Sequence, residues 1–226
     1  MEHSEFSFTI RSCEDLCRAV RTYGIVPLFR NRIPGFSVEE HAHPSVWFSD
    51  SDGVWEWKGS VIRETGCAYG RVLFAQTAFV MPEWYRALAN ARRDGYNFDA
   101  RYEDGLAPYA DRILYELVDA NAPVVSKRLK ELGNYRKDGR KGFDASMNRL
   151  QHQCYVLTSD FVYARDRFGR PYGWGLAEYS TPERQFGGAF SENVYAEEPE
   201  QSRERIVRHL TGLFPGAPED WLRKEI

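Results

Sequence analysis

Three amphipathic segments in the second half of the chain constrain its fold more than any other feature of the sequence. In the third segment Phe143, Met147 and Leu150 recur at i, i+4 and i+7, the spacing that places side chains on one face of a helix. The two earlier segments show the same apolar period, and Gly133 follows the second. The sequence therefore predicts three helices, over residues 111–120, 124–132 and 143–153.

Alternating residues follow the third segment. Residues 154–163 and 172–179 alternate as strands do, and Gly169 and Pro171 lie in the turn expected between them. Three short helices followed by a β-hairpin are typical of a winged helix-turn-helix. We therefore predict such a unit in this part of the chain.

The first half of the chain gives weaker signals. Ser12 is the expected cap of a helix over 12–23, and Pro82 is expected to open another that runs to about Arg93. The remaining segments are assigned from composition. They are strands or loops over 25–57 with at most one short helix near 37–43, strand structure over 67–79, and a charged linker over 97–105.

These predictions give an α+β chain, mainly α, with winged helix-turn-helix units and a C-terminal helical extension. We expect an N-terminal α+β domain over 1–104, for which a winged-helix-like arrangement is one option. A winged helix-turn-helix domain over 105–180 follows. The extension over 181–226 begins with the helix-start signals Ser-Thr-Pro-Glu and packs back against the body. Its expected helices lie over 201–213 and 219–224.

Positive charge is concentrated in one segment of a chain whose net charge is −3. Residues 127–149 hold eight basic and three acidic side chains, a net charge of +5, so the rest of the chain carries −8. A concentrated basic segment in an acidic protein favours contact with a polyanion. The alternative is an ordinary solvated surface of loop and helix faces.

The cysteines and histidines give little sign of redox or metal chemistry. Cys13 and Cys17 lie one helical turn apart and His41 and His43 alternate, but neither pair has further ligands at a convincing spacing. We therefore expect no metal and no cofactor. Four scattered cysteines, no long apolar stretch and no secretory signal in the first twelve residues favour the cytoplasm.

In a winged helix-turn-helix the third helix is the DNA reader, because a helix fits the major groove and presents side chains to base edges. The loop before it would lie beside phosphates, and the hairpin tip would reach the backbone or the minor groove. The candidate DNA-binding residues are Arg136, Lys137, Arg140 and Lys141 in the loop, Ser146, Asn148, Arg149, Gln151, His152 and Gln153 in the helix, and Arg165, Arg167 and Arg170 in the hairpin. Alternatively, Phe168, Tyr172 and Trp174 would serve a protein interface.

Four segments resemble the AlkZ-related proteins, relatives of the winged-helix DNA glycosylases of the AlkZ/YcaQ type. They are RRDGYNFDARYEDG over 92–105, KGFDASMNRLQHQ over 141–153, PYGWG over 171–175 and STPE over 180–183. The resemblance implies several winged-helix units around a DNA-binding concavity, with double-stranded DNA as the partner. It also implies excision of alkylated or crosslinked bases in the true enzymes, and a monomer if this chain is glycosylase-like.

The catalytic motif of those glycosylases is missing from its expected place. They carry Gln-x-Gln or Gln-x-Asp just after a helix and a Gly-hydrophobic-hydrophobic step. The similar step here is Gly24-Ile25-Val26, but residues 27–29 contain neither a carboxylate nor an amide. A Gln-x-Gln occurs only later, over 151–153, where chance or DNA reading explains it better. The sequence therefore assigns no catalytic residue.

The prediction is a DNA-binding winged-helix protein, a divergent or non-catalytic relative of DNA glycosylases that recognises alkylated or crosslinked DNA. One alternative is a transcriptional regulator, which should dimerise on a palindromic site. The other is a protein-interaction scaffold with no nucleic-acid role. A cleft at residues 27–29 without any polar side chain would nearly exclude glycosylase chemistry.

Overall fold

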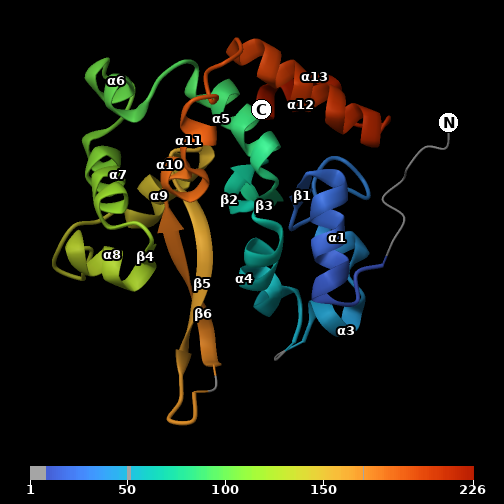
Figure 1. The fold of residues 1–226 in the computed structure, drawn as a ribbon, viewed down its shortest axis with the longest axis horizontal. Helices are drawn as coiled ribbons and strands as arrows, with labels where there is room; N and C mark the ends of the chain where they lie inside the picture. Colours follow the sequence, from blue (N-terminus) through green and yellow to red (C-terminus); the bar gives the residue numbers. More distant parts are fainter. Residues whose placement is uncertain (1–8, 50–51, 170) are drawn as a thin grey trace.

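The computed structural model describes residues 9–49, 52–169 and 171–226. Over those residues the fold is mixed α+β and mostly helical, with one six-stranded antiparallel sheet. The strands lie in the order β1-β3-β2-β5-β6-β4 (Figure 1). Their bounds are Ile25–Pro27 (β1), Ala68–Leu73 (β2), Gln76–Val80 (β3), Val124–Val125 (β4), Leu157–Arg165 (β5) and Pro171–Ser180 (β6).

Helix α1, Cys13–Tyr23, confirms the first predicted helix. The Ser12 hydroxyl accepts a hydrogen bond from the backbone of Asp15, and Gly24 ends the helix with a φ of 72°. A Cβ at Gly24 would lie 2.3 Å from the Trp84 ring, so the position needs glycine for its space as well as its conformation. The fold therefore explains why a glycine stands at position 24, between α1 and β1.

Residues 44–57 correct the prediction of strands or loops over 25–57. Helix α2, Val38–His41, fits the short helix expected near 37–43. However, Pro44–Trp47 forms α3 and Val54–Thr65 forms α4. Pro44 takes the first turn of α3, where a missing N–H is tolerated, while Gly53 at the start of α4 offers no side-chain cap. The start of α4 therefore carried no capping signal in the sequence.

Residues 67–79, expected to form strand structure, are most of a β-hairpin. Strands β2 and β3 pair antiparallel, and Phe74 and Ala75 between them both have positive φ. Tight turns of this kind usually use Asn or Gly, so the sequence did not reveal this one.

Helix α5, Pro82–Arg93, confirms the second predicted helix of the first half. The linker expected over 97–105 is wrong, because Phe98–Glu103 forms α6. Asn97 caps α6, and Phe98 is buried and stacks on Tyr115 at 4.2 Å between ring centroids. The cap at Asn97 and the packing of Phe98 therefore help to order this highly charged segment.

The three predicted helices and the hairpin are confirmed as α7 (Tyr109–Asn121), α8 (Ser126–Leu132), α9 (Phe143–His152), β5 and β6. The sequence did not predict β4, which precedes α8 and pairs antiparallel with β6. Helix α9 packs against α7 and against β2, so it connects α7 with the sheet. The β5–β6 hairpin extends well beyond the rest of the molecule (Figure 1).

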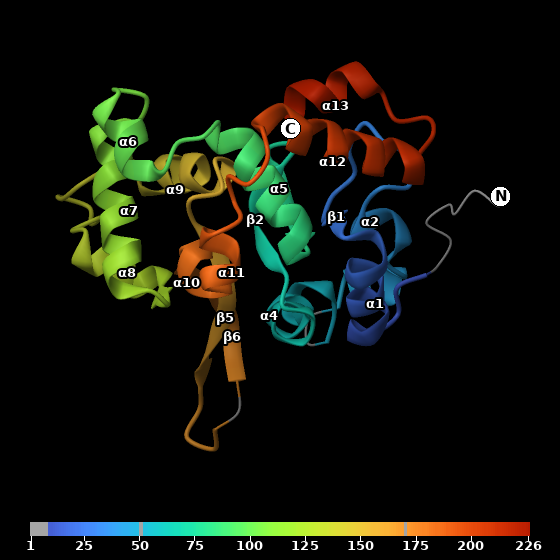
Figure 2. The same ribbon diagram turned by 45° about the horizontal axis from the view of Figure 1, so that its top comes forward.

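The C-terminal segment packs back against the body, as predicted. Its helices are α10 (Pro182–Phe186), α11 (Gly188–Ser191), α12 (Pro199–Leu213) and α13 (Glu219–Glu225). Helix α12 lies along α5 in both views (Figures 1 and 2). There His209 stacks on Trp84 at 3.9 Å and forms a 2.8 Å hydrogen bond with the carbonyl of Tyr23.

Two clusters of buried apolar side chains stabilise this arrangement. The larger joins residues 10–91 to α12, α13 and the start of β5, and the smaller lies among α6, α7, α8 and α9. None of the helices in the described ranges is both long enough and apolar enough to cross a bilayer.

Candidate nucleic-acid interface and central cleft

A cleft of about 350 Å³ lies where the segment after β1, helix α4 and helix α9 meet on the sheet. Such a volume is within the range of small-molecule sites, roughly 300–1,000 Å³. Leu28 and Phe29 line it, so the segment that follows the Gly24 step does face a cleft. Polar and charged side chains also line it, namely Lys58, Arg71, Thr77, Asp144, Asn148, Gln151 and Thr158.

Three aromatic rings form what we call the aromatic wall of the cleft: Phe29, Trp55 and Phe161. The centroids of Phe29 and Trp55 lie 5.9 Å apart, and Phe29 is 36% exposed. Trp47 supports them from outside the cleft, because its ring lies 5.4 Å from Trp55 and its carbonyl accepts the Trp55 indole hydrogen bond at 3.0 Å. Fixed and partly exposed rings of this kind can stack against a planar base.

Lys58 lies between two rings of the aromatic wall. Its Nζ is 5.3 Å from the centroid of Trp55 and 4.6 Å from that of Phe161. No described residue forms a hydrogen bond or an ion pair with it. Burial lowers the pKa of Lys58, and the negative charge of Glu56 opposes that shift. Lys58 is therefore a poorly solvated amine that faces a cleft without a carboxylate partner.

Gln151 is buried beside the cleft, and both ends of its amide are occupied. Its Oε1 accepts a hydrogen bond from the backbone N–H of Arg71 at 2.8 Å, and its Nε2 donates to Thr158 at 3.3 Å. A Cβ at Gly70 would lie only 3.2 Å from this amide, so glycine allows the close approach of α9 to β2. Gln151 thus ties the helix to the sheet.

The other two residues of that Gln-x-Gln segment lie elsewhere. His152 lines a separate cavity of about 460 Å³ with Arg92 and Arg101, and its carbonyl accepts a 2.8 Å hydrogen bond from Arg92. Although part of the residue is exposed, desolvation of the ring and the charge of Arg92 lower the pKa of His152 to about 4. Gln153 is half-buried just beyond the helix. The structure does not bring Gln151 and Gln153 together as a pair.

The outward face of α9 is narrower than expected. Ser146 is 1% exposed rather than outward, because α9 is packed between α7 and the sheet and buries a wide face. Arg149 forms two hydrogen bonds with the buried carboxylate of Asp111, at 2.5 and 2.8 Å. Asn148 is exposed and lines the cleft. Of the candidates on α9, Asn148 is therefore the best placed to contact a ligand in the cleft.

The four basic residues of the loop before α9 are all exposed. None of Arg136, Lys137, Arg140 and Lys141 forms an ion pair with any residue that the structure describes. Backbone contacts order the loop: the N–H of Arg140 donates to the carbonyl of Asn134 at 2.8 Å, and Lys141 Nζ donates to the carbonyl of Lys137. The loop therefore presents four unneutralised cations just before the helix that lines the cleft.

The tip of the β5–β6 hairpin adds one described cation. Arg167 is exposed and lies 4.7 Å from the ring centroid of Phe168. The side chain of Arg165 and all of Arg170, both predicted contacts, lie outside the described part of the chain. Trp174 on β6 is 84% exposed, so the hairpin also presents a large aromatic surface.

Comparison with known families supports the resemblance seen in the sequence. A family profile described as AlkZ related matches residues 10–226. The chain belongs to the AlkZ-related family. Among solved structures, the Streptomyces sahachiroi DNA glycosylase AlkZ is similar to this AlkZ-related chain at 12% identity, with a TM-score of 0.49. The match covers 93% of the chain and 54% of that structure, so the chain spans about half its length. Comparison with curated proteins gives no match.

The cleft of this AlkZ-related protein contains residues that the sequence did not single out. Trp55, Phe161 and Lys58 lie on α4 and β5, more than 100 residues apart in the chain. In the sequence, aromatic residues at such positions are indistinguishable from core residues. The tertiary fold brings the two elements together: α4 packs directly on β5, and Arg63 of α4 forms an ion pair with Asp160 of β5.

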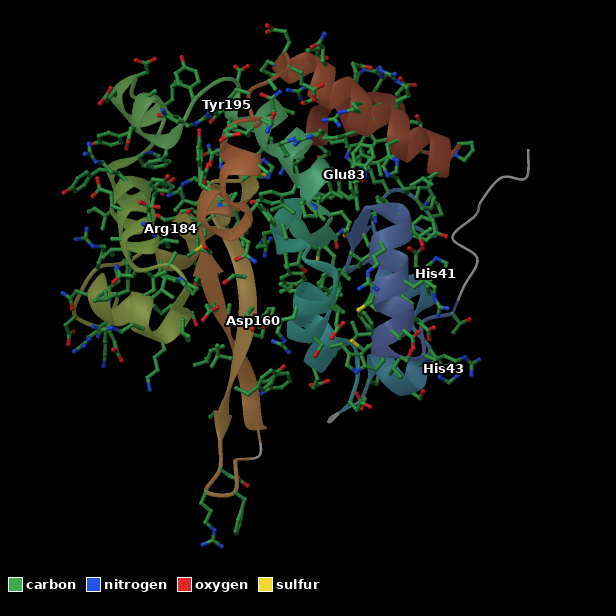
Figure 3. All side chains as sticks on the ribbon, viewed as in Figure 1. His41, His43, Glu83, Asp160, Arg184 and Tyr195 are labelled. Atoms are coloured by element: carbon green, nitrogen blue, oxygen red, sulfur yellow. The ribbon has the colours of Figure 1, made fainter. Side chains whose placement is uncertain are left out.

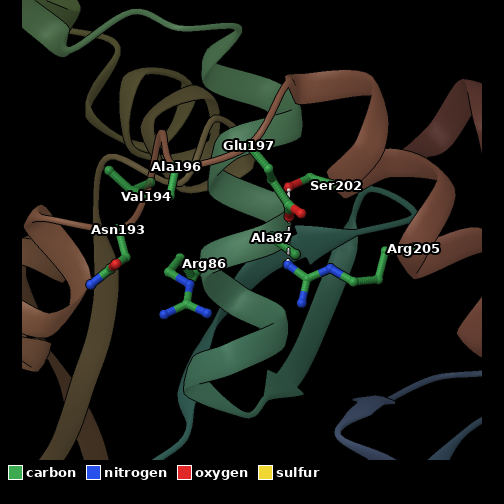
Figure 4. Close-up of a pocket in the computed structure, with 8 residues that line it drawn as sticks. All are labelled: Arg86, Ala87, Asn193, Val194, Ala196, Glu197, Ser202 and Arg205. Atoms are coloured by element: carbon green, nitrogen blue, oxygen red, sulfur yellow. Dashed lines mark hydrogen bonds and ion pairs between the residues drawn. The ribbon is translucent and has the colours of Figure 1, made fainter.

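A further cavity, of about 260 Å³, lies between α5 and the segment that leads into α12 (Figure 4). Glu197 there accepts hydrogen bonds from Ser202 at 2.5 Å and from Arg205 at 2.7 Å. The hydroxyl of Ser202 and the charges of Arg205 and Arg86 outweigh desolvation and lower the pKa of Glu197. Glu197 therefore neutralises Arg205, and the contacts join α12 to the preceding segment.

The residues considered for metal binding have other contacts. His41 lies 2.8 Å from the carbonyl of Gly35, and His43 lies 2.7 Å from the hydroxyl of Ser45 (Figure 3). Cys13 and Cys17 are free thiols, and burial raises the pKa of Cys13 to about 12. Within the described ranges no group of three or more His, Cys, Asp or Glu is arranged to hold a metal ion.

Proposed function

We propose that this AlkZ-related protein binds double-stranded DNA and holds a displaced nucleotide of an alkylated or crosslinked lesion in the central cleft. In this proposal residues 105–180 are a winged helix-turn-helix unit that follows an N-terminal domain over 1–104. Residues 181–226 are the helical extension that supports both. We expect it to act in the cytoplasm, and as a monomer if it is glycosylase-like.

The loop before α9 supports the DNA contact. Four exposed cations without carboxylate partners can each neutralise a phosphate, and phosphate contacts dominate the affinity of proteins for DNA. Lys130 on α8 also lies nearby, but it pairs with Asp144 at 3.9 Å and is not one of these phosphate contacts. The unpaired positive charge of the loop therefore lies just before α9, at the same end of the helix as Asp144 of the cleft.

The aromatic wall carries the proposal that the cleft takes a nucleotide. Phe29, Trp55 and Phe161 offer π faces to a base, and Arg71 offers positive charge to its phosphate. Proteins that act on a damaged base first remove it from the helical stack, at a cost that is lowest for damaged or mispaired bases. A cleft of this size beside a cationic loop is suited to receive such a base.

The polar groups of the cleft favour recognition over base excision by the family chemistry. Cleavage of an N-glycosidic bond needs a carboxylate or amide that positions water in water-poor surroundings. Each end of the Gln151 amide already forms a hydrogen bond, with Arg71 and with Thr158, and these bonds fix its orientation. The side chain of Asp144 is 87% exposed and pairs with Lys130, so it remains solvated. We therefore expect lesion binding without release of the base.

Binding and base release measured on the same DNA test this proposal. The protein is titrated into matched duplexes with and without an alkylated base, and the alkylated duplex is then assayed for abasic sites. Tighter binding to the alkylated duplex, without abasic sites above background, supports it. Base release would instead make the protein a glycosylase. Dimerisation on a selected palindrome would favour a transcriptional regulator. If the protein binds no duplex, the protein-interaction scaffold is the alternative that remains.

A further inference from the structure

We propose that the Nζ of Lys58 captures abasic DNA by forming a Schiff base with the C1′ aldehyde of the ring-opened sugar. The inference rests on the proposed function, because the abasic nucleotide must enter the same cleft. It adds a substrate class, the aldehyde that remains after a base is lost, and a covalent step that the amide residues of the cleft do not provide.

The position of Lys58 supports this step. Its amine lines a cleft large enough for a sugar, and the rings of Trp55 and Phe161 lie on either flank, 5.3 and 4.6 Å from Nζ. Lys58 is half-buried, and a lysine with little access to water normally finds a carboxylate, since an unpaired charge is costly away from water. Lys58 has no ion-pair or hydrogen-bond partner among the described residues. Its amine is therefore available to an incoming electrophile.

The chemistry needs only the aldehyde and an amine with a lone pair. Neutral Nζ attacks C1′, the C1′–oxygen double bond becomes a single bond, and a proton moves from nitrogen to that oxygen to give a carbinolamine. The hydroxyl then takes up a proton from solvent and leaves as water, and the nitrogen lone pair forms the nitrogen–C1′ double bond of a protonated Schiff base. No oxidant or reductant is consumed, and the DNA strand stays intact. Burial, which lowers the pKa of Lys58, increases the fraction of neutral amine at a given pH.

Lys130 provides a matched comparison within the same chain. It also lies 4.6 Å from an aromatic centroid, that of Phe143, but it is 44% exposed and pairs with Asp144. An amine that is paired with a carboxylate is less available to an electrophile. The two lysines therefore have similar contacts with aromatic rings, but only Lys130 has a carboxylate partner among the described residues.

Borohydride trapping tests the inference. The 226-residue chain is mixed with an end-labelled duplex that carries one abasic site, sodium cyanoborohydride is added, and covalent complexes are resolved on a denaturing gel. We expect a complex with the wild type and with Lys130→Met. We expect at least a tenfold loss with Lys58→Met and with Lys58→Arg, while both variants still bind the abasic duplex. Mass spectrometry of the wild-type complex should place the adduct on Lys58.

Three results would overturn the inference. One is binding of the abasic duplex without any trapped complex, and a second is an adduct on the N-terminal amine or on another lysine. Both would leave the proposed function standing. The third, no binding to any duplex, would remove the proposed function as well. Because mapping uses the wild-type protein, the test remains decisive if a Lys58 variant fails to fold.

Discussion

Arg93 of α5 donates a hydrogen bond to Oε1 of Glu183 on α10, at 2.6 Å. The Arg93 side chain is 2% exposed, and it also donates to the carbonyl of Cys154 at 2.6 Å and lies 4.6 Å from the ring centroid of Tyr155. Although burial opposes its charge, Glu183 and Tyr195 raise the pKa of Arg93. Arg93 and Glu183 belong to two of the segments that resemble the AlkZ-related family. Part of that resemblance therefore reflects the fold rather than the site.

Replacing Arg93 should destabilise the protein strongly. Arg93→Met leaves Glu183 and a buried carbonyl without their donor, and we expect the free energy of unfolding to fall by about 3–5 kcal/mol. Urea unfolding followed by circular dichroism measures this change. Arg184→Met is the matched control, because the Arg184–Asp119 pair is about half exposed on both sides and its loss should cost less than about 1 kcal/mol. Equal effects of the two substitutions would contradict this account of Arg93.

Removing one ring of the aromatic wall should weaken lesion preference without weakening general DNA binding. Phe29→Ala removes a stacking surface, and we expect the preference for alkylated over undamaged duplex to fall by about 1–3 kcal/mol. Fluorescence anisotropy on both duplexes measures it. Phe48, which is 79% exposed and does not line the cleft, provides the control Phe48→Ala. An unchanged preference in Phe29→Ala would argue against stacking in the cleft.

Local signals in the sequence were sufficient for much of the fold. Capping at Ser12, the proline that opens α5 and the apolar period of α9 each depend on neighbouring residues, and each prediction is confirmed. Local signals did not predict the segments whose conformation depends on tertiary contacts. Asn97 and Phe98 order α6 because Phe98 packs on Tyr115, and Phe74 and Ala75 turn between strands without the usual turn residues.

The lowered pKa of Lys58 should be measurable by titration. Reductive ¹³C-methylation followed by NMR should show its resonance shifting at a lower pH than those of exposed lysines, because burial disfavours the charged form. Between the lowered pKa and the ordinary value of 10.5, the unfolded chain binds more protons than the folded one. Ionisation of Lys58 therefore makes stability rise with pH in that window.

The pH range between the lowered pKa of Lys58 and 10.5 also gives a kinetic prediction. The rate of trapping on abasic DNA should rise with pH and level off below 10.5, and Lys58→Met should abolish the rise. A Lys58 resonance that titrates with those of exposed lysines would contradict both predictions. So would a trapping rate that is independent of pH.

The site was less predictable than the fold, for reasons that particular residues make clear. The apolar period of α9 predicted the centre of its buried face. Ser146 and Gln151 are also buried, because α9 packs against both α7 and β2. The sequence predicted Arg149 to be a DNA contact, but its guanidinium pairs with Asp111, which lies 38 residues away in the chain. The loop cations were predictable because an exposed loop needs no tertiary partner.

The salt dependence of duplex affinity tests the central claim most directly. Anisotropy is measured between 50 and 200 mM salt for the wild type, for Arg140→Glu with Lys141→Glu, and for Arg18→Glu with Arg21→Glu. The second pair changes the charge equally on α1, at the far side of the molecule from α8 (Figures 1 and 2). We predict a steep fall of wild-type affinity with salt, and a slope smaller by about two in the loop variant only. Absent or salt-independent binding, or equal loss in both variants, would contradict the account.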